Sequence, residues 1–158
     1  MDLPRPAAVA FVEGEQGRVL LVRVPRYTTG LSEWELPAGG MEPGEAPVET
    51  VRREALEETG YRLAACELIY SYYPLPGVTN KLVHVLRGRA QGAPGDFDRG
   101  EVSEVAWFTP AAVRRLIQKR HMHDGIALVA TLLRLRDAFT DCTDDTDQER
   151  KGHGSREA

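Results

Sequence analysis

Residues 39–61 read GGMEPGEAPVETVRREALEETGY, and the expected fold follows from this segment. Pro47 suits the first turn of a helix, because the N–H that proline lacks would be unpaired there anyway. The segment from Pro47 to Thr59 is rich in Glu, Arg, Ala and Leu, and Gly60 is a typical residue at a helix end. The sequence therefore predicts a helix over this segment, preceded by a loop that runs through Gly44.

Three glutamates crowd one side of the predicted helix. At roughly 100° per residue, Glu54, Glu57 and Glu58 occupy an arc of about 100° beside the apolar positions Val51 and Ala55. Like charges three and four residues apart repel each other and lower helix stability. A solvated acidic face is the plain structural alternative. A hard divalent cation among the carboxylates explains their crowding better, with magnesium as the first candidate and manganese as the second.

The spacing around these glutamates favours the cation. The stretch follows the pattern Gly-x5-Glu-x7-Arg-Glu-Ala-Leu-Glu-Glu-Thr-Gly-Tyr, which resembles the Nudix box at every defining position from Gly39 to Tyr61. The resemblance implies an α/β fold: an α/β/α sandwich with a mixed, partly closed β-sheet between helices. In that fold the box forms a loop, a helix and a second loop.

The resemblance also implies roles for residues of the box. Glu54 and Glu58 would be the primary metal ligands, and Glu57 would complete the acidic cluster as a second-ion ligand or catalytic carboxylate. The backbone carbonyl of Ala38 would also bind metal. Arg53 would orient one carboxylate through a charge-assisted hydrogen bond or contact phosphate directly.

The resemblance also places two further residues of the box, Gly39 and Glu45, at or near the substrate. Gly39 would lie beside the substrate. Glu45 would be an outer ligand or a partner of Arg53. The resemblance implies hydrolysis of a pyrophosphate bond by water. Divalent ions neutralise the charge of the pyrophosphate and lower the pKa of the water that they bind, so a carboxylate needs only to remove the remaining proton from that water. We expect Glu101, in the loop before the last strand, to be that base, with Glu104 as the alternative.

The substrate is indicated by two shorter matches. WELPAG at 34–39 and YYPLPGVT at 72–79 resemble the ADP-ribose pyrophosphatase subgroup, with Pro76 and Gly77 expected near the substrate. Core packing explains Trp34 and Tyr73 almost equally well. The chain enters the core fold within about ten residues, without the N-terminal strands that supply adenine contacts across a dimer in many of those enzymes. Nucleotide sugars, dinucleotides and damaged nucleoside triphosphates therefore stay open.

The rest of the chain predicts one domain, residues 1–140, followed by a disordered polar tail over 141–158. We expect a β-hairpin from the runs 6–12 and 18–24, and strands over 62–73, 80–90 and 102–108. Two helices should close the domain. The first is capped by Thr109 and runs to about Lys119, and the second ends near Phe139.

Composition limits the classes of partner. The 158 residues carry a formal net charge of −4, which gives no basic surface for nucleic acid or an anionic membrane. Cys66 and Cys142 form no CxxC pair, and no apolar run is long enough for a membrane span. A cytoplasmic enzyme is the prediction, and a homodimer is left open. The competing class is a nucleotide-binding Nudix module without activity, which commonly lacks a glutamate of the box. This chain retains Glu45, Glu54, Glu57 and Glu58.

Overall fold

The computed structural model describes residues 4–136, so the predicted tail and Phe139 lie outside the described part of the chain. The elements follow in the order β1 (Ala7–Glu13), a 3-10 turn (Glu15–Gly17), β2 (Val19–Arg26), β3 (Leu31–Glu35), β4 (Ala38–Gly40), α1 (Pro47–Thr59), β5 (Arg62–Tyr72), β6 (Val83–Gln91), β7 (Glu104–Phe108), α2 (Pro110–Gln118) and α3 (Gly125–Leu135).

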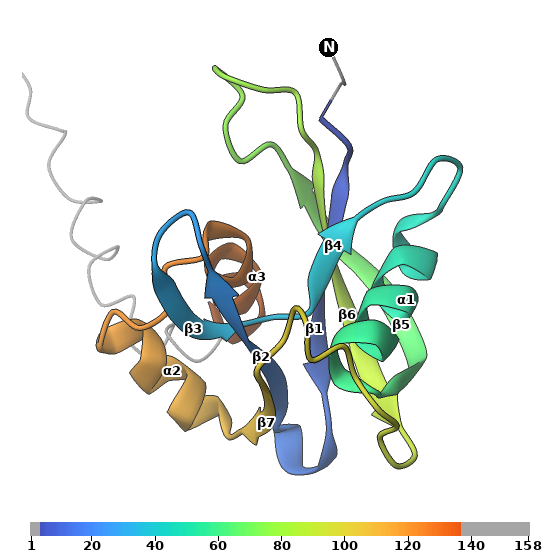
Figure 1. Ribbon diagram of the computed structural model, residues 1–158, viewed down its shortest axis with the longest axis vertical. Coiled ribbons are helices and arrows are strands. Elements are labelled where there is room, and N and C mark those ends of the chain that lie inside the picture. The colour runs from blue at the N-terminus through green and yellow to red at the C-terminus, as the bar shows by residue number, and fades with distance from the viewer. Residues whose placement is uncertain (1–3, 137–158) are drawn as a thin grey trace, which may run out of the picture.

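The sheet is mixed and is covered on both faces. Its strands run in the order β3-β2-β1-β6-β5, with β4 paired to β1 and β7 paired to β2. Only the β1–β6 pair is parallel among the pairs of the described strands. Helix α1 lies on one side of β1 and β6, and α3 lies on the other (Figure 1). The predicted α/β/α sandwich is confirmed.

Strand β1 forms the centre of the molecule because both of its faces are buried. Ala8, Ala10 and Val12 pack in the cluster that contains Val51 and Ala55 of α1. The alternate residues Ala7, Val9 and Phe11 pack in the cluster that contains Ala127 and Ala130 of α3. A strand buried on both faces reads as a continuous apolar run, which matches AAVAFV in the sequence.

The expected hairpin of the first two strands forms only at its closed end. β1 and β2 share the single register pair Glu13↔Val19, after which β1 pairs with β4 while β2 pairs with β3 and β7. The two groups of strands therefore diverge, as Figure 1 shows for β2 and β4. The end of β2 and strand β4 line a common cavity.

Helix α1 begins and ends as its sequence predicts. Pro47 occupies the first turn, and Glu49 accepts a hydrogen bond from the backbone N–H of Ala46 at 2.8 Å. Gly60 ends the helix with φ of +73°, a conformation that glycine adopts without strain. The predicted helix over 47–59 is confirmed. Among residues 4–136, no helix is long and apolar enough to span a membrane.

Candidate active site

Two buried carboxylates of α1 open onto one cavity. Glu54 and Glu58 are each 8% exposed, one helical turn apart. They lie at the wall of a cavity of about 400 Å³ between the end of β2, strand β4 and a loop before β7. Its lining comprises Val24, Pro25, Arg26, Tyr27, Ala38, Gly39, Gly40, Glu54, Glu58, Gly100 and Glu101.

Gly39 makes room for one of these carboxylates. A Cβ atom added at Gly39 would lie 1.9 Å from Oε1 of Glu54, far inside contact distance. At the neighbouring Gly40 a Cβ would meet nothing within 4 Å. A side chain at position 39 would therefore displace the Glu54 carboxylate from its place against the β4 backbone.

Burial controls the charge of Glu58. Desolvation raises the pKa of Glu58 to about 8, although the backbone N–H of Ala38 donates to its Oε2 at 3.0 Å and lowers the pKa. Repulsion from Glu54 and Glu101 adds to the rise. Burial also raises the pKa of Glu54, against the opposing effect of Arg53. The carboxylate pair is thus costly to ionise without a cation nearby.

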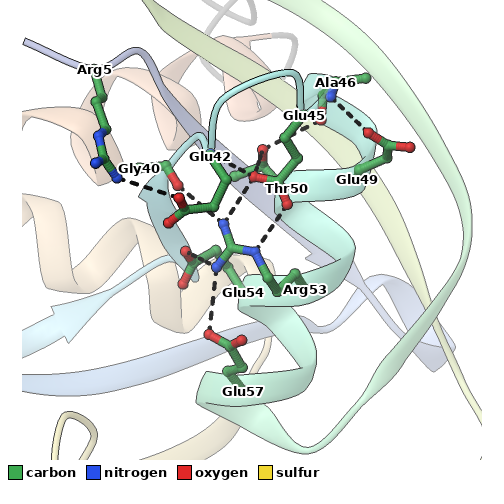
Figure 2. Close-up of polar contacts among 10 residues, drawn as sticks. All are labelled: Arg5, Gly40, Glu42, Glu45, Ala46, Glu49, Thr50, Arg53, Glu54 and Glu57. Atoms are coloured by element: carbon green, nitrogen blue, oxygen red, sulfur yellow. Dashed lines mark hydrogen bonds and ion pairs between the residues drawn. The ribbon is translucent and has the colours of Figure 1, made fainter.

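Arg53 ties the box together, as Figure 2 shows. Its guanidinium donates to both oxygens of Glu45, at 2.9 and 3.0 Å, to Oε1 of Glu54 at 2.7 Å and to the carbonyl of Gly40 at 3.0 Å. The hydrogen bond from Arg53 holds the pKa of Glu45 at about 2. In this arrangement Arg53 orients the carboxylate of Glu54. Glu45 is the partner of Arg53.

Glu57 lies apart from the two buried glutamates. Its side chain is 55% exposed and approaches Arg53 at 3.5 Å, and it does not line the cavity. Within residues 4–136 no three His, Cys, Asp or Glu side chains are gathered closely enough to hold a metal ion as they stand. The structure therefore brings two of the three predicted side-chain ligands together.

Glu101 reaches the cavity from a distant part of the sequence. It lines the same cavity as Glu54 and Glu58, and its charge contributes to raising the pKa of both. Glu104, the alternative base, is instead paired with Arg23 across the β2–β7 ladder at 3.1 Å.

The remaining predicted residues lie outside this cavity. Pro76 and Gly77 are exposed in the loop between β5 and β6 and do not line it. From the same loop, Lys81 lines an adjoining hollow of about 190 Å³ that shares Arg26 and strand β4 with the main cavity. His123 contacts Glu33 at 2.8 Å, near the start of α3.

Sequence reasoning missed Arg26. Its guanidinium donates to both oxygens of the buried Glu35, at 3.0 and 2.5 Å, and its side chain remains 52% exposed at the cavity. In the β2–β3 ladder Arg26 is opposite Leu31 and Glu35 is opposite Val22, so the two residues meet through the long Arg26 side chain and not as cross-strand partners. The sequence contained one signal that could have pointed to this pair: Glu35 stands two residues before Pro37-Ala38-Gly39.

The donor set fits a hard divalent cation. Among residues 4–136, Oε1 of Glu58 and Oε2 of Glu54 accept no hydrogen bond from the protein. Carboxylate oxygens without a hydrogen-bond donor are ligands that Mg²⁺ prefers, with water completing its shell. Ala38, whose carbonyl is a further ligand in the resemblance, lines the same cavity as Glu54 and Glu58.

The comparisons with known proteins agree with this geometry. Residues 3–128 match the model of the NUDIX domain. The ADP-ribose pyrophosphatase of Bacillus subtilis (strain 168) is 30% identical over 139 residues, which cover 85% of this chain and 75% of that protein. A putative 8-oxo-dGTP diphosphatase of the same strain is 32% identical over 120 residues, covering 74% of this chain and 76% of that protein.

A solved structure shows the same fold. The NUDIX hydrolase from Nitrosomonas europaea has a TM-score of 0.67 and 25% sequence identity, covering 85% of this chain and 90% of that chain. The domain match spans most of the chain, and Glu54, Glu57 and Glu58 lie on helix α1. This chain therefore belongs to the Nudix hydrolase family, whose members are pyrophosphohydrolases of nucleotide derivatives.

Proposed function

We propose that the protein is a magnesium-dependent hydrolase of nucleoside diphosphate derivatives that cleaves ADP-ribose to AMP and ribose 5-phosphate. The observation that carries this proposal is the cavity into which Glu54, Glu58 and Glu101 all open. Its wall contains two buried carboxylates, each with one oxygen that accepts no hydrogen bond from the described residues, and a third carboxylate from a separate loop. Such a layout suits a cation, a pyrophosphate and a base for an attacking water.

Each residue has a distinct task in this proposal. Glu54 and Glu58, with the Ala38 carbonyl, would hold Mg²⁺, which neutralises pyrophosphate charge and acidifies bound water. Arg53 keeps Glu54 aimed at the cavity through its 2.7 Å hydrogen bond, and Glu45 anchors Arg53 in turn. Glu57, half exposed beside Arg53, would reach a second ion at the mouth of the cavity.

The reaction itself requires one proton transfer at Glu101. Its carboxylate would take a proton from the water as the water oxygen attacks one phosphorus. The bond from that phosphorus to the bridging oxygen then breaks, and the leaving phosphate keeps the bridging oxygen. Pro76 and Gly77 would approach the nucleoside or sugar only if the β5–β6 loop moved toward the cavity, so their roles remain part of the proposal.

Support for ADP-ribose comes from resemblance. WELPAG at 34–39 and the pyrophosphatase of Bacillus subtilis point to that substrate. Other relatives act on different compounds by name, including GDP-mannose pyrophosphatases and the putative 8-oxo-dGTP diphosphatase. The alternative is therefore a nucleotide sugar or a damaged nucleoside triphosphate as substrate.

Steady-state assays of the full chain with Mg²⁺ test the proposal. The substrates are ADP-ribose, GDP-mannose, NADH, a dinucleoside polyphosphate and 8-oxo-dGTP, with products separated chromatographically. ADP-ribose should give the highest kcat/KM, and Glu58→Gln should lower kcat by orders of magnitude. The matched control is Glu104→Gln, which removes a carboxylate that pairs with Arg23 outside the cavity. A preference for 8-oxo-dGTP with pyrophosphate release would refute the substrate assignment.

A further inference from the structure

The loop that delivers Glu101 is organised by Asp98. This residue accepts a hydrogen bond from the N–H of Gly100 on its side-chain Oδ1, at 2.8 Å. Its backbone carbonyl accepts from the N–H groups of Glu101 and Val102, at 3.3 and 3.0 Å. Three consecutive N–H groups around the catalytic carboxylate are therefore satisfied by one residue.

Asp98 also ties this turn to α1. Its own N–H donates to the carbonyl of Glu57 at 2.7 Å, and Glu57 stands between Glu54 and Glu58 in the sequence of the helix. Carbonyls in the last turn of a helix have no partner within the helix, so an external donor is favourable there. The loop is thereby fixed to the same turn that carries the buried carboxylates.

A hydrogen bond before the turn and a buried residue after it fix the two ends of this segment. Gly95 donates to the carbonyl of Gly60 at 2.8 Å, just beyond the helix, and Val102 is fully buried. Glu101 therefore lies between the turn at Asp98 and an anchored apolar residue. The backbone around Glu101 has little freedom to move while these contacts hold.

Asp98 and Gly100 are fitted to each other. A Cβ added at Gly100 would lie 3.0 Å from Oδ1 of Asp98, tighter than ordinary contact. Asp96, two residues earlier in the same loop, accepts no hydrogen bond and forms no ion pair within residues 4–136. The hydrogen bonds of Asp98 thus distinguish it from a solvated aspartate of the same loop.

We propose that Asp98 is a positioning residue that holds Glu101 over Glu54 and Glu58 through its side-chain bond to Gly100 and its backbone bond to Glu57. This inference rests on the proposed function, because it assigns Asp98 a role through the base of that reaction. The side chain of Asp98 does not line the cavity. Its effect is on the placement of the Glu101 carboxylate.

The test compares Asp98→Ala with Asp98→Asn on the best substrate at saturating Mg²⁺. A typical hydrogen bond contributes about 0.5–1.5 kcal/mol net, so its loss should lower kcat by about two- to twelvefold, with KM nearly unchanged. Asn retains an Oδ1 acceptor for the N–H of Gly100 and should restore most of kcat. Asp96→Ala is the control, because it removes the same charge from the same loop without removing a hydrogen bond.

A double-mutant cycle with Glu101→Gln separates positioning from general loop damage. If Asp98 acts through Glu101, the double variant turns over no more slowly than Glu101→Gln alone. If the fold losses of the two single variants multiply in the double variant, or if Asp98→Ala has native kinetics, the positioning role is overturned. The proposed hydrolase function would not be affected by either result. A native protein that cleaves none of the pyrophosphates would instead overturn the proposed function, and the role of Asp98 with it.

Discussion

Magnesium binding should release a proton from Glu58. Burial raises the pKa of this carboxyl to about 8, so in the metal-free protein about 0.9 of the molecules hold the proton at pH 7 and about 0.1 at pH 9. A carboxyl must be ionised to bind a metal, so each binding event at pH 7 displaces that proton. The raised pKa of Glu54 acts in the same direction.

Two quantities follow from this linkage. The number of protons released per Mg²⁺ should fall from about 0.9 at pH 7 to about 0.1 at pH 9 from Glu58 alone. Over the same range the apparent affinity for Mg²⁺ should rise about tenfold, because competition from the proton disappears.

Isothermal titration calorimetry measures both quantities. Titrations at each pH in two buffers of different ionisation enthalpy give the proton count directly. Glu58→Gln should abolish most of the release at pH 7, while Glu104→Gln should preserve it, since that carboxylate is exposed on β7. Negligible proton release by the native protein at pH 7, or release that is undiminished in Glu58→Gln, would refute this account of the site.

Three other perturbations have defined outcomes. Without Mg²⁺, the free energy of unfolding should fall as pH rises from about 4.5 to about 8, by at most about 1.4 kcal/mol per unit, because folded Glu58 retains a proton that the unfolded chain has lost; urea titrations with a flat pH profile would contradict this. Mg²⁺ should raise the Tm of the native protein because it binds only the folded state; Gly39→Ala, whose methyl would displace the Glu54 carboxylate, should reduce both this rise and turnover while circular dichroism is unchanged. Gly60→Ala, at φ of +73° and 2.1 Å from a carbonyl oxygen of the facing loop, should lower the free energy of unfolding by at least about 1–3 kcal/mol, whereas Gly40→Ala should not.

Helix α1 could be predicted from the sequence because its limits depend on local chemistry. Proline at the start and glycine at the end act through their own backbone conformations, and both lie where the sequence places them. The pairing of β1 could not be predicted in this way. The sequence suggested β2 as its partner, yet its main partners are β6 and β4, because a strand buried on both faces is placed by packing with distant segments.

The candidate site divides along the same line. The spacing of Glu54 and Glu58 was enough to predict that they share a face of the helix, and the surrounding pattern was enough to predict the family. Folding of the whole chain buries this face against β4, brings Glu101 to the same cavity and leaves Glu57 outside it. The reason is physical: helical periodicity acts over a few residues, whereas desolvation and charge repulsion depend on atoms that folding brings together from distant parts of the chain.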